Sequence, residues 1–366
     1  MKIGIMSFPN MTSYGCTLQM YALYRAVEQA GAEAEIINYR NEYMKARRHT
    51  SAGRGKSVIK SALRVTAAKV LHLRQILAFR SFEHRMCHYP AKPTSEKQTL
   101  TEGAKRYDGV ICGSDQVWNP LITDTDLSFF LDFCGADTKR ISYAPSFGIS
   151  DFSDDFTDRI KPELEKFQHL SVREEVGARY VQSLINKPTE VVLDPTFLID
   201  REEWTKLEQP HPMATGKYIF CFPVRKSAAL IRFSLELAER NHAALIVAEG
   251  NFLTRMRNKN SRIKYALDIS PEEWLYLMHH ADCVVTNSFH GAAFSIHYHK
   301  EFYLECSSHK ANSRLEQLVE QCGLHDRVIQ EGRDSWNQHI DFADVEERLA
   351  SARQASMDYL KRSIWQ

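Results

Sequence analysis

The sequence lacks the short motifs that mark the commonest cofactor sites. Neither a GxGxxG fingerprint nor a Walker sequence occurs in its 366 residues, so we predict no NAD, FAD or ATP at its turns. The eight cysteines include no CxxC pair, which argues against a zinc or redox motif and is typical of a reducing cytoplasm. No apolar run approaches the ~18 residues that a membrane span needs, and Met1 to Phe8 is too short for a signal-peptide core.

A metal site and a nucleic-acid partner are likewise not indicated. The nearest candidate ligands are the pairs His279–His280 and His297–His299, and we expect no carboxylate or cysteine partner near either pair. We therefore interpret both pairs as structural and predict no metal. The formal net charge is +1, so the charge of the whole chain does not predict a nucleic-acid partner.

The composition that is present is that of a soluble globular protein, with 43% hydrophobic and 25% charged residues. Strand-like apolar runs alternate with helical periodicity up to about residue 195, and a second series begins at Tyr218. Proline and glycine mark a boundary between about 195 and 215. The predicted fold class is α/β, with two doubly wound Rossmann-like domains facing a cleft (GT-B-like). Their predicted limits are 1–205 and 206–340, and a last helix within 341–366 could pack back on the first domain.

A basic helical insert interrupts the first domain at residues 40–90. Twelve Lys or Arg and only two acids lie between residues 40 and 85. Lys56, Lys60 and Arg64 recur at four-residue spacing, on one face of the helix expected from residue 57 to 82. Two readings are open, an anionic membrane surface as docking partner or an ordinary solvated face. The predicted location is cytoplasmic, and the first reading adds peripheral contact with the inner membrane face.

The stretch from Val284 to Ala292 is typical of a buried parallel strand, a polar turn and the start of a helix. His290 then lies at the carboxyl end of a strand, where ligands bind in open α/β sheets. Gly291 would let a ligand approach the backbone, and the helix that follows would offer N–H groups to an anion. The alternative is a capping turn in which His290 only satisfies a neighbour.

Further loops follow predicted strands at residues 12–15, 113–119, 145–148 and 223–226. In the loop 113–119, Asp115 either places a carboxylate at the sheet edge or caps a short helix, and Trp118 either binds or only packs. Two doubly wound domains that face each other leave a cleft between their strand ends. That arrangement is the architecture of GT-B-type glycosyltransferases.

Six short stretches are weak signals singly but specific as a series over roughly residues 1–325. They are Tyr14-Gly15 with Leu18-Gln19, Gly113 to Asn119, Ser142 to Gly148, Ser171 to Glu174, Leu193 to Thr196, and Ser288 to Gly291. Together they resemble the polysaccharide pyruvyl transferase family. The resemblance implies a GT-B-like fold and transfer of pyruvate from phosphoenolpyruvate to a sugar as a ketal. The acceptor would be a sugar of a bacterial cell-surface polysaccharide or its lipid-linked oligosaccharide precursor.

The family's chemistry can be carried onto residues of this chain. His290 would be the acid that protonates the donor, and Asp115 the base that takes the proton of a sugar hydroxyl. The expected donor-binding residues are Arg225, Ser288, Phe289, Gly291 and Arg314. The expected acceptor-binding residues are Tyr14, Gln116, Trp118 and Asn119. Phosphoenolpyruvate is a substrate here, and no cofactor is expected.

The sequence departs from the family's pattern at the donor site. Some members carry an arginine two residues before the motif histidine, and this chain has Ser288 there. Another arginine must then hold the donor, because the guanidinium fork matches carboxylate and phosphate oxygens. Arg225 matches a second family arginine at a strand end and Arg314 is the next choice, although either could form a surface salt bridge. A GT-B glycosyltransferase that uses a nucleotide sugar, or a scaffold with a degenerate cleft, are the alternative functions.

Overall fold

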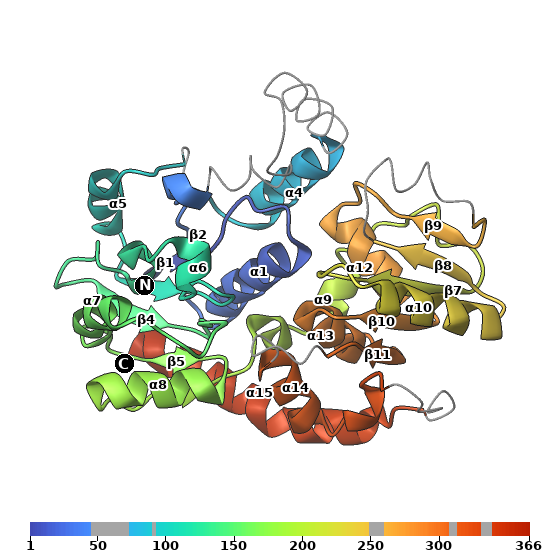
Figure 1. The fold of residues 1–366 in the computed structure, drawn as a ribbon. Helices are drawn as coiled ribbons and strands as arrows, with labels where there is room; N and C mark the ends of the chain where they lie inside the picture. Colours follow the sequence, from blue (N-terminus) through green and yellow to red (C-terminus); the bar gives the residue numbers. More distant parts are fainter. Residues whose placement is uncertain (45–72, 90–92, 249–259, 307–312, 331–338) are drawn as a thin grey trace, which may run out of the picture. The chain divides into compact units, whose positions relative to one another are not determined.

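The computed structural model describes residues 1–44, 73–89, 93–248, 260–306, 313–330 and 339–366. The chain divides into two compact units, each built around its own parallel sheet (Figure 1). Unit 1 comprises Met1–His72, Phe79–Ile199 and Ala352–Gln366, and unit 2 comprises Leu73–Ala78 and Asp200–Ser351. The chain thus passes into unit 2 at Asp200 and returns at Ala352, where the sequence placed the limits at residues 205 and 340.

The sheet of unit 1 has the strand order β2-β1-β3-β4, and all its neighbours are parallel. Its strands are β1 (Lys2–Met6), β2 (Glu33–Ile36), β3 (Gly109–Cys112) and β4 (Lys139–Ser142). A two-stranded ladder of β5 (Ser171–Val172) and β6 (Glu190–Val191) follows, and a bridge between Ile141 and His169 leads to it from β4. The central strands are apolar and buried because a parallel sheet is covered on both faces.

The helices of unit 1 begin at local signals that are readable in the sequence. They are α1 (Tyr14–Gln29), α4 (Leu73–Met86, its first six residues assigned to unit 2), α5 (Lys97–Ala104), α6 (Pro120–Thr123), η1 (Leu127–Phe130), α7 (Asp154–Leu164), α8 (Glu175–Ile185) and η2 (Pro195–Leu198). Helix α1 starts after Ser13, whose hydroxyl accepts the N–H of Cys16. Gly31, with φ +87°, follows its end.

The sheet of unit 2 has the order β11-β10-β7-β8-β9, again with all neighbours parallel. Its strands are β7 (Tyr218–Phe222), β8 (Ala244–Val247), β9 (Ile263–Tyr265), β10 (Cys283–Thr286) and β11 (Phe302–Leu304). Its helices are α9 (Arg201–Thr205), α10 (Ala228–Arg240), α12 (Pro271–His279), α13 (Phe289–His297), α14 (Ser313–Cys322) and η4 (His325–Arg327). A capping box of Ser270 and Glu273 begins α12.

The last helix, α15 (Phe342–Trp365), ends within unit 1. There the Tyr359 hydroxyl donates to the carbonyl of Ser142 at 2.8 Å, and the hydroxyl of Ser356 accepts the N–H of Leu193 at 3.0 Å. The end of the chain is therefore hydrogen-bonded to β4 and to the segment after β6. Both segments belong to stretches of the series identified in the sequence, Ser142 to Gly148 and Leu193 to Thr196.

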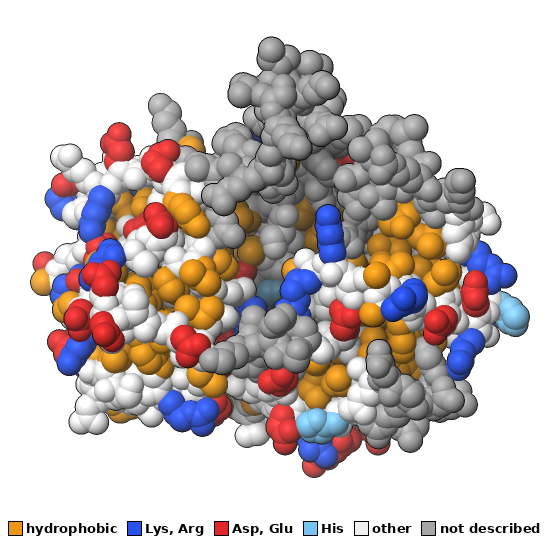
Figure 2. Space-filling view, viewed as in Figure 1, with side chains coloured by type: hydrophobic (Ala, Val, Ile, Leu, Met, Phe, Trp, Pro, Cys, Tyr) orange, Lys and Arg blue, Asp and Glu red, His pale blue; other side chains and the backbone are white. Residues whose placement is uncertain are grey.

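The basic insert can be followed only in part. Lys56, Lys60 and Arg64 lie outside the described residues, so membrane docking through them stays a prediction. The described remainder is α4, whose Phe79 and Phe82 pack against the rings of Tyr14 and Tyr21. Over the parts of the chain that the structure describes, no helix has the combined length and apolar character needed to cross a bilayer. Acidic and basic side chains are interspersed over the described surface in view in Figure 2, in keeping with the net charge of +1.

Candidate functional site

The predicted strand, turn and helix around His290 are confirmed. Strand β10 ends at Thr286, Ser288 is the N-cap, and α13 begins at Phe289. His290 therefore sits in the first turn of α13, where it is 8% exposed and meets the Phe289 ring edge-on. A histidine in this position lies at the carboxyl edge of a parallel sheet and at the positive end of a helix.

A glycine is required at position 291 for a different reason from the one that the sequence suggested. A Cβ on this residue would lie 2.4 Å from the hydroxyl oxygen of Thr286, so the close approach is made by Thr286 and not by a ligand. The N–H of Gly291 is also taken, because it donates to the Ser288 hydroxyl at 3.3 Å. The N–H of Ser288 in turn donates to the hydroxyl oxygen of Thr286, at 3.0 Å. In this structure Ser288 and Gly291 shape the turn that presents His290, and their contacts with the donor stay a prediction.

Asn287 joins the loops that follow neighbouring strands. Its side-chain oxygen accepts the N–H groups of Val224 and Arg225 at 2.8 and 3.2 Å. Its amide nitrogen donates to the Arg225 carbonyl at 2.9 Å and to the Glu305 carboxylate at 3.0 Å. Since β10 lies between β7 and β11 in the sheet, Asn287 ties the loops after β7 and β11 to the His290 turn. The structure therefore brings the Arg225 loop and the His290 turn together at one sheet edge.

Glu305 is a residue of this edge that the sequence reasoning missed. It follows β11 directly, and besides Asn287 it accepts a hydrogen bond from Ser227, the N-cap of α10. The available signal was its place in the sequence. Glu305 directly follows β11, which pairs with β10, the strand before the His290 turn. The remaining donor candidates are partly exposed: Phe289 and Arg225 at the edge itself, and Arg314 on the first turn of α14.

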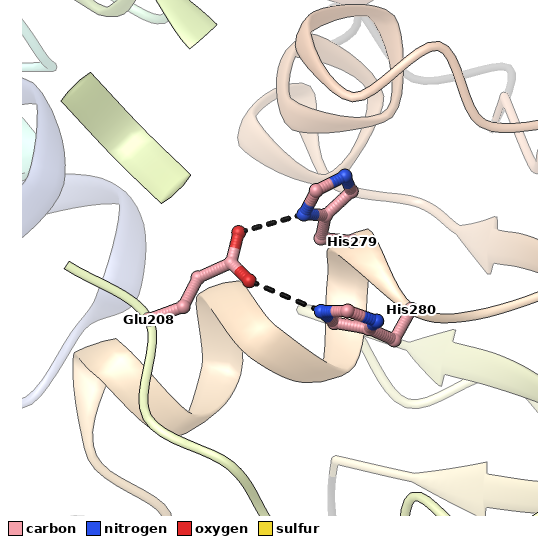
Figure 3. A group of neighbouring side chains, drawn as sticks. All are labelled: Glu208, His279 and His280. Atoms are coloured by element: carbon pink, nitrogen blue, oxygen red, sulfur yellow. Dashed lines mark hydrogen bonds and ion pairs between the residues drawn. The ribbon is translucent and has the colours of Figure 1, made fainter. Parts of the chain in front are cut away.

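The expectation that neither histidine pair has a carboxylate partner is wrong. Nε2 of His299 lies 2.9 Å from a carboxylate oxygen of Glu346. Another carboxylate is shared by His279 and His280. Glu208 lies between them, with its two oxygens 2.8 Å from Nδ1 of His279 and 3.2 Å from Nε2 of His280 (Figure 3). The carboxylate is 71 positions away along the chain, so proximity in the sequence could not reveal it. This group offers metal ligands, and it lies away from the His290 turn.

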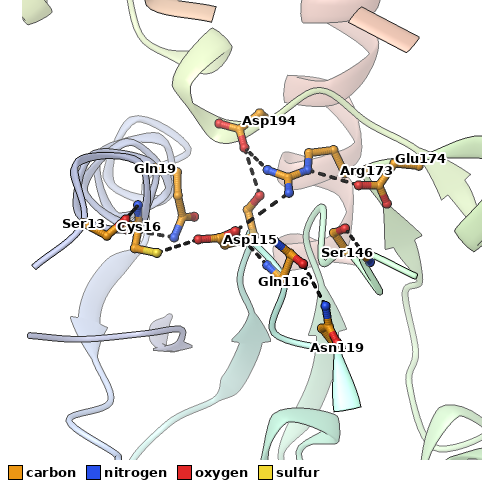
Figure 4. A network of polar contacts seen from close by, with 12 residues as sticks. Ser13, Cys16, Gln19, Asp115, Gln116, Asn119, Ser146, Arg173, Glu174 and Asp194 are labelled. Atoms are coloured by element: carbon orange, nitrogen blue, oxygen red, sulfur yellow. Dashed lines mark hydrogen bonds and ion pairs between the residues drawn. The ribbon is translucent and has the colours of Figure 1, made fainter. Parts of the chain in front are cut away.

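In unit 1 the loop after β3 holds Asp115 in an unusual backbone conformation. Its φ is +74°, a region that aspartate and asparagine tolerate better than most residues. One carboxylate oxygen accepts the N–H of Gln116 at 2.8 Å, and the other accepts the thiol of Cys16 at 2.7 Å (Figure 4). The Asp115 carbonyl accepts the N–H of Ser146, which joins this loop to the one after β4. Asp115 is therefore placed by both neighbouring loops.

Cys16 enters this arrangement as a protonated donor. Burial, reinforced by the negative charge of Asp115, raises the pKa of the Cys16 thiol well above its ordinary value. The thiol consequently keeps its proton and points it at the Asp115 carboxylate. The sequence placed Cys16 at the start of a helix but contained no signal for this contact, because the two residues are 99 positions apart.

Arg173 connects several of the short stretches that carry the family resemblance. It is 4% exposed, and it donates to Asp194 at 2.6 Å, lies 3.5 Å from Glu174 and 3.9 Å from Asp115. Ser114 donates to the same oxygen of Asp194 at 3.2 Å. Burial alone would lower the pKa of Arg173, but these carboxylates outweigh it and raise the pKa above its usual value. The buried ion cluster in Figure 4 thus supports the Asp115 loop.

The four candidates for acceptor binding differ in how deeply their side chains are buried. Trp118 is completely buried, donates its Nε1–H to the Phe129 carbonyl at 3.0 Å and stacks on Phe130, so its expected ligand contact is corrected to core packing. Asn119 is the buried N-cap of α6, and its amide donates to Gln116 at 2.7 Å. Tyr14 is 9% exposed. Gln116 is the partly exposed member of the set, and we keep it as the acceptor candidate.

Gly148, in the loop after β4, lies against the side chain of Gln116 in the loop after β3. Its φ is +66°, and a Cβ there would stand 2.1 Å from the side-chain oxygen of Gln116. A larger residue at this position would therefore displace Gln116 as well as strain the backbone. The glycine of the Ser142 to Gly148 stretch consequently has a direct steric reason.

A pocket of about 810 Å³ lies elsewhere in unit 1. Its lining includes Arg140, Gln168, His169 and Lys187, which flank the amino ends of β4, β5 and β6. The candidate residues lie at the carboxyl ends of the strands. This pocket is therefore separate from the candidate site.

Comparison with known families matches residues 14–304 to the model described as "Polysaccharide pyruvyl transferase". The match spans most of the chain and includes the loops of both units described above. A search of curated proteins found no match.

Solved structures of similar fold are GT-B enzymes. A UDP-GlcNAc 2-epimerase from Neisseria meningitidis, bound to UDP-GlcNAc, has a TM-score of 0.53 at 12% identity over 99% of this chain and 94% of its own. UGT89C1 of Arabidopsis thaliana has a TM-score of 0.52 at 11% identity over 99% and 98%. The Anabaena protein HepE, in complex with UDP and glucose, has a TM-score of 0.51 at 12% identity over 100% and 98%. At these identities the likeness concerns the fold alone, which is GT-B-like.

Proposed function

Because this chain belongs to the polysaccharide pyruvyl transferase family, we propose that it transfers pyruvate from phosphoenolpyruvate to a sugar and closes a ketal on two of its hydroxyls. The observation that carries the proposal is the Asn287 contact set, which brings the Arg225 loop to the His290 turn. One edge of the sheet then carries both an anion-binding fork and a proton donor. Phosphoenolpyruvate requires both of these groups.

The donor is held by Arg225 and the first turn of α13. A guanidinium can hold two oxygens of a carboxylate or phosphate in one plane, and a helix N-terminus favours negative charge. Asn287 holds both the N–H and the carbonyl of Arg225. Glu305 holds Asn287 in turn, which makes it a positioning residue for the Arg225 loop. Arg314 is the second choice for the donor arginine.

The reaction starts with proton transfer from His290 to the methylene carbon of phosphoenolpyruvate, which leaves a cation at C2. A sugar hydroxyl forms a C–O bond to C2 and gives its proton to Asp115. A second sugar hydroxyl then attacks the same carbon, and the C–O bond to phosphate breaks. The products are the cyclic ketal and inorganic phosphate. His290 recovers its proton from the medium or from the second hydroxyl.

The acceptor is a sugar of a cell-surface polysaccharide or of its lipid-linked precursor, met in the cytoplasm or at the inner membrane face. Gln116 and Asp115 contribute to its recognition from the loop after β3. The membrane contact rests on the sequence of the basic insert alone.

A thermal-shift measurement separates this function from the nucleotide-sugar alternative. Phosphoenolpyruvate should raise the melting temperature, because a ligand that binds only the folded state stabilises it by mass action, whereas UDP-sugars should not. Incubation with phosphoenolpyruvate and a panel of sugars, followed by mass spectrometry, should then detect the ketal. Stabilisation by a UDP-sugar with no effect of phosphoenolpyruvate would instead favour a glycosyltransferase.

Arg225→Lys should weaken phosphoenolpyruvate binding by roughly ten- to hundredfold. A hydrogen bond to a charged group is worth about 1.5–3 kcal/mol, and lysine keeps the charge but loses the fork. Calorimetric titration of the donor measures this directly. The matched control is Arg262→Lys, since Arg262 is 58% exposed and pairs with Glu239 on the surface of the same unit. An unchanged dissociation constant in Arg225→Lys would move the donor site to Arg314.

A further inference from the structure

Glu208 is a nearly buried carboxylate, and among the described residues Lys300 is a cation close enough to interact with its charge. The Glu208 side chain is 7% exposed, and within 4.0 Å its only described ion-pair partners are the imidazoles of His279 and His280. A neutral histidine can share a hydrogen bond with the carboxylate but adds no positive charge beside it. Holding the negative charge of a carboxylate away from water is unfavourable unless a cation accompanies it.

The two imidazole rings are oriented by aromatic neighbours. The ring of His279 stacks on Tyr298 with centroids 4.3 Å apart and an angle of 11°. The ring of His280 stacks on Tyr276 at 4.1 Å and 28°. These stacks direct Nδ1 of His279 and Nε2 of His280 toward the same carboxylate (Figure 3). The backbone of the Glu208 segment is held as well, since the N–H of Gln209 donates to the carbonyl of Glu272 in α12.

We propose that Glu208, His279 and His280 form a site for a divalent transition metal, with zinc as the favoured ion. The three ligand atoms lie within 4.8 Å of one another. In a tetrahedral zinc site with bonds of about 2.0–2.1 Å, ligand atoms are separated by roughly 3.3 Å. The separations of 2.8 and 3.2 Å end on the two different oxygens of Glu208, so an ion between the three side chains would require a rotation of the carboxylate and an outward shift of the imidazoles.

The donor set selects the kind of metal. Two imidazoles and one carboxylate suit zinc, cobalt or nickel, whereas magnesium and calcium prefer oxygen ligands only. The side chain of His280 is 46% exposed, so the fourth position opens to solvent and a water molecule can occupy it. The bound ion would place a positive charge directly beside the Glu208 carboxylate.

The site would pin the segment that follows α9 to the end of α12. Tyr298, which supports His279, is the C-cap of α13, whereas His290 is in the first turn of the same helix. At 1.5 Å per residue, the two positions are roughly 12 Å apart along the helix. The metal is therefore a structural element of unit 2, and pyruvyl transfer does not depend on it chemically. A failure of the proposed transfer reaction would leave this inference untouched.

Calorimetric titration with zinc tests the site directly. The whole chain, stripped with EDTA and dialysed, should bind one zinc ion per molecule, and its melting temperature should rise with zinc but not with magnesium. Glu208→Gln and His280→Ala should each weaken zinc binding by more than about 100-fold, because even second-shell changes lower metal affinity by about 10–100-fold. Cobalt should give the visible absorption of a tetrahedral site in the wild type and lose it in both variants.

His325→Ala is the matched control. His325 also pairs with a glutamate, at 3.0 Å from Glu320, but it has only one such partner and is 63% exposed. This variant should bind zinc as the wild type does, and circular dichroism should show native folding of every variant. Absence of stoichiometric zinc binding by the wild type would overturn the proposal, leaving two histidine–carboxylate hydrogen bonds. Equal affinity in Glu208→Gln and the wild type would also overturn it.

Discussion

Replacing His290 by asparagine is expected to lower the turnover number for pyruvyl transfer by about 10²–10⁴-fold, the usual contribution of a general acid. Asparagine keeps a polar group of similar reach in the first turn of α13 but cannot deliver a proton to carbon. The donor should still bind, because Arg225 and the end of the helix are unchanged. Steady-state kinetics should therefore show a loss in kcat with little change in KM.

The control for this variant is His299→Asn. His299 is a partly exposed histidine of the same unit that pairs with Glu346 at 2.9 Å, and its replacement should leave transfer unchanged. Melting temperatures of both variants should stay close to that of the wild type. Activity of His290→Asn within a few-fold of wild type would remove His290 from the reaction and leave it a capping-turn residue.

Asp115→Asn is expected to reduce turnover on a similar scale, about 10²–10⁴-fold, because the amide cannot accept the proton of the sugar hydroxyl. The backbone should tolerate the change, since asparagine also adopts the positive φ of +74° found here. The amide oxygen can still accept the Gln116 N–H or the Cys16 thiol. Phosphoenolpyruvate affinity should be unaffected, which separates a defect in the acceptor step from a defect in donor binding.

Asp124→Asn provides the matched comparison for Asp115. Asp124 is another aspartate at positive φ, +57°, but it is exposed at the end of α6 and should be neutral. If Asp115→Asn loses stability along with activity, the carboxylate is chiefly a member of the buried cluster around Arg173. Full activity in a stable Asp115→Asn protein would show that another group takes the hydroxyl proton.

The sequence by itself determined the alternation of strands and helices in two series. Apolar runs such as β10 are typical of buried parallel strands, and local caps such as Ser270 mark helix starts. The same local pattern placed His290 at a strand end before any contact was known. Short edge elements escaped prediction: β9 is only partly buried and includes Lys264, so it carries little apolar signal.

Only the tertiary structure decided which side chains meet and which merely pack. Trp118 lies in the stretch Gly113 to Asn119 but packs in the aromatic core. The absence of a side chain at Gly291 leaves room for the hydroxyl of Thr286. Asn287 joins the loops after three strands, and Glu208 reaches two histidines 71 and 72 positions away. The parallel sheet brings the partners of Asn287 together, and the packing of the segment after α9 against α12 brings Glu208 to the two histidines. A local window of the sequence shows neither arrangement. Local propensity and periodicity report on a residue's own element, whereas the polar contacts of a site join residues from different elements.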